Sequence, residues 1–176
     1  MPVRMHRRGE IISIKDILDL EVAVGFKLPA DFKWFLLNYN GGRPENNRCT
    51  LPTDDCGCGV TNFFDIIEII ANKRQMAYRV PYNALPIADA ECGNLVCIVF
   101  GERAGIYYWD HEWESEEDEE PWWENMHYLS PTFTEFWNSL EPFGPDDLEL
   151  KPGQEEAKVW INPKYADLVE KWRKDS

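Results

Sequence analysis

The chain has 176 residues, of which 44% are hydrophobic and 14% aromatic, so it can build the core of one domain and is too apolar to be disordered throughout. Its net charge of -14 excludes a nucleic acid as the direct ligand, because affinity for phosphate comes from Lys and Arg, and disfavours an anionic membrane surface. The chain has no apolar run of about 18 residues and no signal-peptide pattern. We therefore expect a cytoplasmic protein that contacts neither nucleic acid nor membrane.

The five cysteines are an odd number for a chain of this length, which favours reduced thiols over a disulfide framework. Cys56 and Cys58 form a CxC motif in a Gly-rich stretch. Structural zinc sites usually combine two CxxC pairs or add His at fixed spacing, and neither pattern is present. We interpret this stretch as a turn with two free thiols, and we predict no metal and no cofactor.

After an arm of residues 1–11, the sequence predicts two helices. Ser13 and Asp16 have the spacing of a capping box, and Gly25 can end the first helix. Pro29 can occupy the first turn of the second helix, and a Gly pair at 41–42 ends it. Each helix has one apolar stripe that we expect to face the core, with Ile14, Ile17, Leu18 and Val22 in the first and Phe32, Phe35, Leu36 and Tyr39 in the second.

The middle of the chain predicts one more helix and several strands. Residues 43–62 are polar and rich in turn residues, with VTNFF at 60–64 as a short strand. Asp65 can cap a third helix that reaches about Tyr78. Two apolar runs around a GERAG turn then predict a β-hairpin. The strands expected here are Leu85–Ala88, Leu95–Phe100 and Ile106–Trp109.

The last part of the chain predicts a returning strand at His127–Leu129 and a closing helix with Phe133, Phe136, Trp137 and Leu140 on one face. Residues 142–157 have the composition of a linker. The tail begins a further helix at Asn162-Pro163, and its apolar face is expected to dock on the main body. That face consists of Tyr165, Leu168, Val169 and Trp172. This order of elements predicts an α+β single domain with a mostly antiparallel sheet of five to six strands flanked by helices, plus a C-terminal helical extension.

Residues 107–124 read YYWDHEWESEEDEEPWWE, in which nine of the 18 residues are acidic and four are Trp. His111-Glu112 begins like the zinc motif HExxH, but Ser115 stands where the second His belongs, and the segment follows a strand rather than forming a helix. Trp122 and Trp123 are adjacent, so they cannot both face inward. Either one packs under the loop or both are available to a partner.

Tryptophan is a common interface anchor, and flanking charges raise association rates and selectivity. We therefore interpret this acidic loop as a partner-binding surface, with a solvated spacer as the alternative. The Trp residues are predicted to act as anchors and the acidic residues to steer and rim the contact. The predicted binding residues are Glu112, Trp113, Glu114, Glu116, Glu117, Asp118, Glu119, Glu120, Trp122 and Trp123.

Four segments in chain order resemble the signature of the SUKH superfamily, the Smi/Knr-type proteins. GFKLPADFKWFLLNYNGGRP matches at Gly25, Leu28, Pro29, Phe32, Phe35, Leu36, Asn40, Gly41, Gly42 and Pro44. LPIADAECGNLVCIVF matches a strand-turn-strand pattern at Pro86, Ile87, Ala88, Gly93 and Asn94. IYYWDHE matches a strand that ends in Trp109, Asp110 and His111, and FTEFWNSL matches the closing helix. The resemblance covers residues 12–141.

The resemblance implies an α+β domain without catalytic activity. Bacterial members of the superfamily are commonly immunity proteins encoded beside polymorphic or contact-dependent toxins, many of them nucleases or nucleotide-modifying enzymes. The implied partner is a cognate basic toxin domain that binds an acidic surface. Two alternatives stay open: a Smi/Knr-type regulatory or scaffolding protein without a toxin, and a metal-dependent hydrolase that uses His111, Glu112 and cysteines. Neither the activity of the toxin nor the oligomeric state follows from the sequence.

Overall fold

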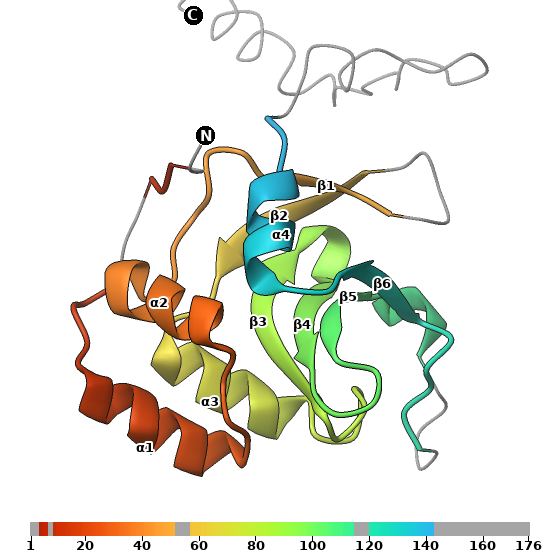
Figure 1. Cartoon of the computed structure of the whole chain (residues 1–176). Helices are drawn as coiled ribbons and strands as arrows, with labels where there is room; N and C mark the ends of the chain where they lie inside the picture. The colour runs from red at the N-terminus through yellow and green to blue at the C-terminus, as the bar shows by residue number, and fades with distance from the viewer. Residues whose placement is uncertain (1–3, 7–8, 52–56, 115–119, 143–176) are drawn as a thin grey trace, which may run out of the picture. The chain divides into compact units, whose positions relative to one another are not determined.

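The computed structural model describes residues 4–6, 9–51, 57–114 and 120–142 (Figure 1). Its helices are α1 (Ile14–Val24), α2 (Ala30–Tyr39), α3 (Ile66–Gln75) and α4 (Phe133–Ser139), with the short 3-10 helices η1 (Glu91–Gly93) and η2 (His111–Trp113). Its strands are β1 (Arg48–Thr50), β2 (Gly57–Phe63), β3 (Ala84–Ala90), β4 (Leu95–Val99), β5 (Gly105–Trp109) and β6 (Met126–Ser130).

The described strands form one antiparallel sheet in the order β1-β2-β3-β4-β5-β6, so each strand pairs with its neighbour in sequence. This arrangement confirms the predicted α+β fold. The chain divides into the units Met1–Phe143 and Gly144–Ser176, and the predicted C-terminal helix lies outside the described residues. Within the described ranges, every helix is too short or too polar to cross a membrane.

The helices begin where local capping residues satisfy the free backbone N–H groups of their first turns. Ser13 and Asp16 form a reciprocal capping box at α1, and Gly25 ends that helix in the left-handed conformation. Asp65 caps α3 through N–H groups of Ile67 and Glu68. These caps use residues within three positions of one another, which explains why the sequence predicts the helix ends well.

The Asn-Gly-Gly sequence after α2 joins three helices. Asn40 has a φ of 47°, and its side chain donates to the carbonyl oxygen of Glu10 at 2.9 Å and accepts from the Ile66 N–H at 3.2 Å. Gly41 follows with a φ of 83°, and a Cβ at this position would lie 2.6 Å from the Asp65 backbone nitrogen. Asn40 and Gly41 therefore have a structural role: they hold the segment before α1 and the start of α3 against the end of α2.

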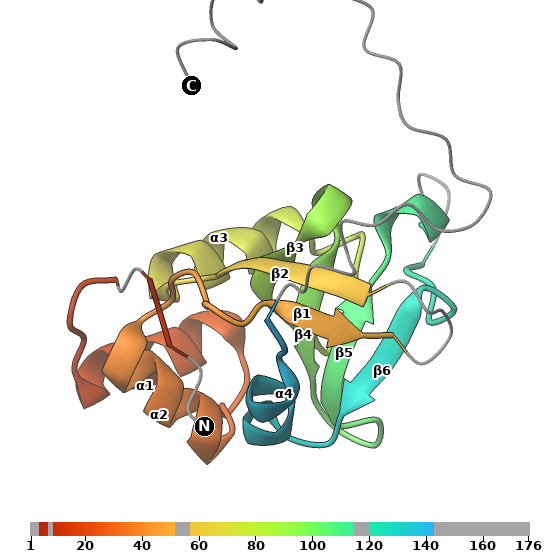
Figure 2. The ribbon, with the colours of Figure 1, turned by 90° about the horizontal axis from the view of Figure 1, so that it is seen from above.

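The hydrophobic core lies between the sheet and the helices (Figures 1 and 2). Helix α1 packs on α3, which packs on β3, whereas α4 packs on α2 and on β5 and β6. Aromatic rings fill the space around α2 and α4: the centroid of Phe35 lies 5.0–5.1 Å from those of Phe63, Phe133 and Trp137. All five residues of β4 are buried, because both faces of the central strands are covered.

The predicted core stripe of α1 is wrong at three of its four positions. The helix buries Ile17, together with Leu20 and Val24. Ile14, Leu18 and Val22 are instead exposed, with 70%, 49% and 82% of their surface accessible. Both sets recur at helical spacing, so the periodicity within α1 cannot decide which set faces the core. Contact with α3 decides it.

The region around β1 also differs from the prediction. Residues 48–50 were expected in a turn-rich stretch, but they form β1, in which Arg48 pairs with Gly59 and Cys49 with Cys58 across the strands. Cys49 is buried and disulfide-bonded, so the expectation of reduced thiols throughout is wrong for this residue. Cys92 and Cys97 are free. The predicted free thiol of Cys56 and the side chain of Cys58 lie outside the described part.

Candidate partner-binding surface

The end of β5 and the helix η2 are held by a buried network around Asn94. The side-chain oxygen of Asn94 accepts from the His111 backbone N–H at 2.9 Å and lies 2.8 Å from His111 Nδ1. The Asn94 amide donates to the Tyr108 hydroxyl. Burial raises the pKa of Tyr108 to about 12, so this hydroxyl stays neutral. Because the Asn94 oxygen only accepts, it holds a proton on His111 Nδ1, and His111 acts as a structural residue.

Asp110 and Asn125 fix the segment that carries the predicted binding residues. The Asp110 carboxylate accepts from the Glu112 N–H at 2.9 Å and so caps η2. The Asn125 side chain donates to the Asp110 carbonyl oxygen at 3.0 Å, and the Asp110 N–H donates to the Asn125 carbonyl oxygen at 3.0 Å. The stretches Glu112–Glu114 and Glu120–Glu124, which we name the acidic Trp surface, therefore start and end on one hydrogen-bonded frame.

Glu114 forms an ion pair with Arg79, a residue 35 positions earlier in the chain. Arg79 Nε donates to one carboxylate oxygen at 2.7 Å and Nη2 donates to the other, while the guanidinium lies 5.2 Å from the ring centroid of buried Trp109. The hydrogen bond to Glu114 raises the pKa of Arg79. Glu114 is thus engaged within the protein, which distinguishes it from the other acidic residues of this surface.

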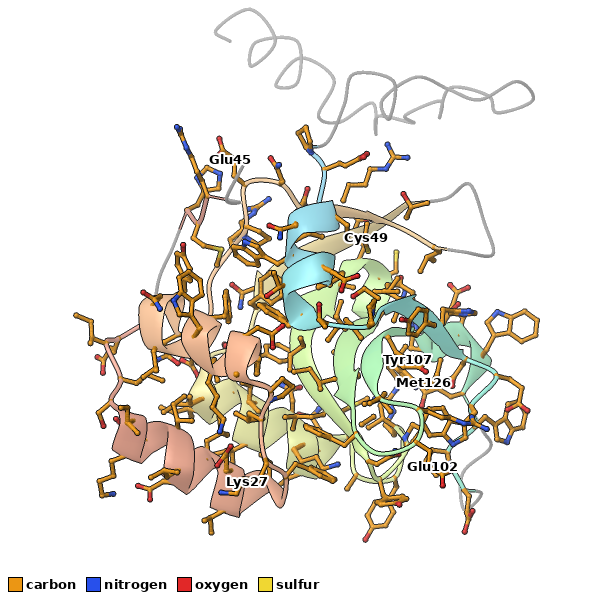
Figure 3. The ribbon with its side chains drawn as sticks, in the orientation of Figure 1. Lys27, Glu45, Cys49, Glu102, Tyr107 and Met126 are labelled. Carbon is orange, nitrogen blue, oxygen red and sulfur yellow. The ribbon has the colours of Figure 1, made fainter. Side chains whose placement is uncertain are left out.

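The three Trp residues of the acidic Trp surface have different environments. Trp113 is 68% exposed and Trp122 is 41% exposed. Trp123 instead packs on the core, in edge contact with Tyr107 and with the Arg103 guanidinium 4.5 Å from its ring centroid. Figure 3 shows Tyr107 on β5 near Met126 on β6, the two strands that support this ring. Of the alternatives left open by the sequence, one Trp packing under the loop is the arrangement found.

A shallow hollow of about 570 Å³ lies beside the exposed face of Trp122. Its walls combine indole rings with the carboxylates of Glu120 and Glu124, and Arg103 closes one side. Among the described residues, Glu112 and Glu120 have no ion-pair partner. Indole faces and carboxylates together suit the cationic side chains of a protein partner.

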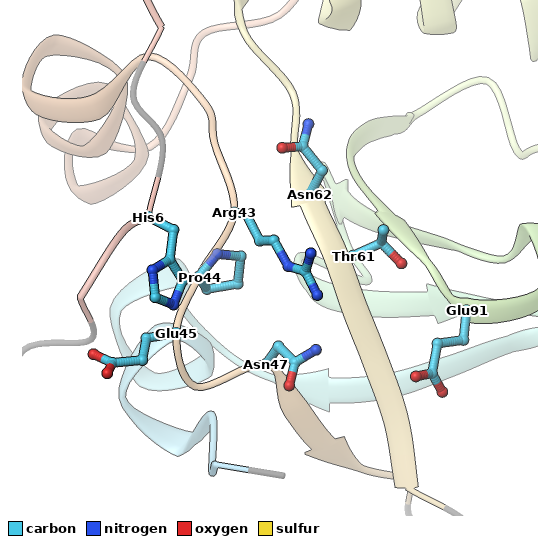
Figure 4. Close-up of a pocket in the computed structure, with 8 residues that line it drawn as sticks. All are labelled: His6, Arg43, Pro44, Glu45, Asn47, Thr61, Asn62 and Glu91. Atoms are coloured by element: carbon cyan, nitrogen blue, oxygen red, sulfur yellow. The ribbon is translucent and has the colours of Figure 1, made fainter. Parts of the chain in front are cut away.

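A larger hollow, of about 870 Å³, was not predicted from the sequence (Figure 4). The arm contributes His6, which is held by a hydrogen bond from its backbone N–H to the Arg43 carbonyl oxygen at 2.8 Å. Strand β2 contributes Thr61 and Asn62. Glu91 of η1 closes the far side and packs on Gly59, where a Cβ would lie 2.3 Å from the Glu91 carboxylate. These residues come from four separate segments, so no local motif could reveal the hollow.

The two hollows belong to neighbouring parts of the molecule. Glu91 lies in η1, and Asn94, which ends η1, binds His111 in η2. The polar hollow around Arg43 therefore borders the same end of the sheet as the acidic Trp surface. In the described part of the chain, Arg43, Glu45 and Glu91 form no ion pair, so their charges are available to a partner.

The structure brings together only part of the predicted binding set. Glu112, Trp113, Glu114, Glu120, Trp122 and Trp123 are described. Glu116, Glu117, Asp118 and Glu119 lie outside the described residues. For the metal hypothesis, His111 is bound to Asn94, and the described residues contain no cluster of three His, Cys, Asp or Glu side chains that could hold a metal ion.

Residues 11–139 match the SMI1 / KNR4 family (SUKH-1), and the chain belongs to this family. The chain is also similar to the SPbeta prophage-derived uncharacterized protein YokK of Bacillus subtilis (strain 168), with 29% identity over 128 residues, 60% of this chain and 66% of the relative. The chain thus spans a little less than two thirds of that relative. The family assignment confirms the resemblance to the Smi/Knr-type proteins.

Proposed function

We propose that this protein is a cytoplasmic immunity protein that neutralises a cognate toxin by direct, non-covalent binding and without catalysis. The observation that supports this most is the acidic Trp surface, where exposed Trp113 and Trp122 stand beside carboxylates that have no partner in the described part of the chain. Membership of a family with many bacterial immunity proteins supports a binding role. The partner is a basic toxin domain, either a nuclease or a nucleotide-modifying enzyme.

Charge complementarity supports the choice of a basic partner. An enzyme that holds phosphate groups needs Lys and Arg in its cleft. An inhibitor with a net charge of -14 and a local cluster of acidic residues is attracted to such a cleft. Electrostatic steering of this kind raises association rates by about ten- to a thousandfold and weakens with salt. Residues 116–119, which the sequence assigns to the same acidic loop, extend the cluster.

The frame beneath the surface supports tight binding. Side chains and loops that become ordered on binding reduce affinity, because their conformational entropy is lost. Here Asp110, Asn94 and Asn125 already hold both ends of the segment by hydrogen bonds of 2.8–3.0 Å. Trp113 and Trp122 are therefore presented on a prepared support, as interface anchors require.

The acidic Trp surface is too small to form the whole contact. A standard interface buries roughly 800 Å² on each partner and uses about 20–30 residues a side. We propose that the contact continues across η1 to the polar hollow lined by Arg43, Thr61 and Glu91. Glu91 extends the acidic character of the contact, and Arg43 provides one site for a carboxylate of the toxin.

The test begins with co-purification of the tagged protein with the product of the neighbouring gene, followed by association kinetics. The double variant Glu112→Lys with Glu120→Lys is expected to slow association by at least about tenfold at low salt. A matched control, Glu10→Lys with Asp19→Lys, changes the net charge equally at exposed sites on the helical side of the molecule. It is expected to slow association much less.

Two results would count against the proposal. Equal slowing by both double variants would show that only net charge matters and would remove the acidic Trp surface from the mechanism. Retention of full toxin neutralisation by the variant Trp113→Ala with Trp122→Ala would show that the exposed indoles are not anchors. If the product of the neighbouring gene does not bind at all, the result favours the alternative of a regulatory or scaffolding protein without a toxin.

A further inference from the structure

Helix α1 carries an exposed aliphatic stripe that the fold does not use. Ile11 before the helix is 98% exposed, and Ile14, Leu18 and Val22 follow at helical spacing with exposures of 70%, 49% and 82%. Single exposed apolar residues are common, but an aligned row along three turns is the pattern of a helix that packs against another helix. The opposite side of the helix already packs on α3 through buried residues such as Leu20.

The segment before α1 is tied to the start of α3, because Asn40 binds both the Glu10 carbonyl oxygen and the Ile66 N–H. The exposed stripe therefore begins where the chain is already held by the fold. We name this stripe the α1 face: Ile11, Ile14, Leu18 and Val22.

The charges beside the α1 face indicate what covers it. Lys15 and Asp19 lie on one flank of the stripe and form an exposed ion pair four residues apart. This flank has no excess of negative charge that would attract a basic partner, because the carboxylate of Asp19 is paired with Lys15. In an antiparallel pairing of two α1 helices, by contrast, each Lys15 comes alongside the partner copy's Asp19. The flank is thus complementary to itself.

We infer that the α1 face is the contact of a symmetric homodimer, in which α1 packs antiparallel against α1 of a second copy. A face of four aliphatic residues is small beside the roughly 20–30 residues a side of a standard interface, so the dimer is weak and depends on concentration. In Figures 1 and 2, α1 and the edge strand β6 lie at opposite sides of the domain, so the dimer leaves the acidic Trp surface free. This inference does not depend on the proposed toxin.

The test is sedimentation equilibrium of the full chain from low to high micromolar concentration. The wild type is expected to show a monomer–dimer equilibrium, and Leu18→Glu to weaken it at least tenfold. Leu18 is half exposed, so this variant stays folded, as circular dichroism can check. Tyr128→Glu is the matched control, because Tyr128 is about as exposed as Leu18, at 44% against 49%, and lies on the edge strand β6. It is expected to leave the equilibrium unchanged.

A charge swap tests the antiparallel geometry. Lys15→Asp and Asp19→Lys are each expected to weaken self-association at least tenfold, yet to form a heterodimer when mixed, because one then supplies two acids and the other two lysines. A wild type that stays monomeric at the highest concentration overturns the inference. So does a dimer that is insensitive to Leu18→Glu, or a mixture of the two charge variants that stays monomeric.

Discussion

The helical side of the molecule and the acidic Trp surface use the same kinds of side chain in opposite ways. On the helical side, Phe35 makes ring contacts with four other aromatic residues besides its neighbour Phe32. Buried Glu21 accepts from the Leu28 N–H at 2.9 Å and pairs with Lys27 and Lys33 at 2.8 and 2.6 Å. On the acidic Trp surface, Trp113 is exposed and Glu112 has no such partner in the described residues.

This difference separates stability from recognition. Aromatic rings and carboxylates that find partners inside the protein contribute to the free energy of folding. Those that stay exposed contribute little to folding and retain their full capacity to bind another molecule. The comparison makes specific predictions, because substitutions of the same residue type in the two regions must have different effects.

The largest effect is expected from an aromatic core substitution. Phe35→Ala removes a fully buried ring and leaves a cavity among Phe63, Phe133 and Trp137. It is expected to lower the free energy of unfolding by about 3–5 kcal/mol. Urea denaturation followed by circular dichroism measures this loss. The matching surface substitution, Trp113→Ala, is expected to cost less than about 0.5 kcal/mol. Similar losses of unfolding free energy in the two variants would contradict the separation between side chains that stabilise the fold and side chains that bind a partner.

The next effect concerns the buried carboxylate. Hydrogen bonds from Lys27 and Lys33 lower the pKa of Glu21 from 4.5 to about 2. A carboxyl with a lowered folded-state pKa stabilises the protein above its unfolded-state pKa and loses that contribution as the pH falls through its folded-state value. Stability from Glu21 is therefore complete above about pH 4.5 and lost toward pH 2.

Glu21→Gln is expected to lower the free energy of unfolding at neutral pH by about 2 kcal/mol, because a charged acceptor with three donors becomes neutral. It is also expected to flatten the pH dependence of stability between pH 4.5 and 2. Denaturation curves at several pH values measure both effects. Glu112→Gln is the surface counterpart and is expected to change the free energy of unfolding at neutral pH by less than about 0.5 kcal/mol. An unaltered pH slope in Glu21→Gln would show that other carboxyls control acid unfolding.

An intermediate effect is expected at the ion pair that connects the two regions. Glu114→Gln replaces the charged acceptor of the Arg79 guanidinium with a neutral one. It is expected to lower the free energy of unfolding by at most about 1 kcal/mol, because both side chains are partly exposed. Added salt is expected to reduce the difference in unfolding free energy between the variant and the wild type, because it screens the ion pair. Arg79→Lys keeps the charge but loses the two-point contact and the stacking on Trp109. A larger loss in Glu114→Gln than in Arg79→Lys would contradict this view of the pair.

The smallest effect on stability, and the sharpest comparison, comes from two adjacent residues. Trp122→Ala is expected to change the free energy of unfolding by less than about 0.5 kcal/mol, whereas Trp123→Ala loses about 1 kcal/mol or more through its contacts with Tyr107 and Arg103. For the rate of dissociation from the toxin the order is reversed, because Trp122→Ala is expected to increase this rate more than Trp123→Ala does. Denaturation and dissociation kinetics together test this reversal, and the same order in both would refute it.

Much of the fold could be predicted because its signals are local. The caps at Ser13, Asp65 and Thr132 and the left-handed Gly25 involve residues a few positions apart, and the helices begin and end there. The hairpin of β4 and β5 follows from two apolar runs around a short turn. By contrast, β1 has three residues and pairs across a polar stretch, so the sequence offered no signal for it.

The candidate site could be predicted only in part. Composition marked the acidic Trp-rich loop, because an excess of acidic residues beside Trp residues can be read from the sequence without knowing the fold. It did not reveal that Glu114 pairs with Arg79 or that Arg43, Thr61 and Glu91 meet around one hollow. These groupings join residues far apart in sequence, so they depend on the pairing of strands and the packing of helices.

The sequence by itself therefore determined the helices and where they begin, most of the strands, the antiparallel character of the sheet and the acidic character of the loop, because caps, turns and periodicity act over a few residues. Only the tertiary structure decided which side of α1 is buried and which of two neighbouring Trp residues packs inward. Ile14 and Ile17 are equally apolar, as are Trp122 and Trp123, so local chemistry cannot choose between them. Contacts with α3, Tyr107 and Arg103 make that choice.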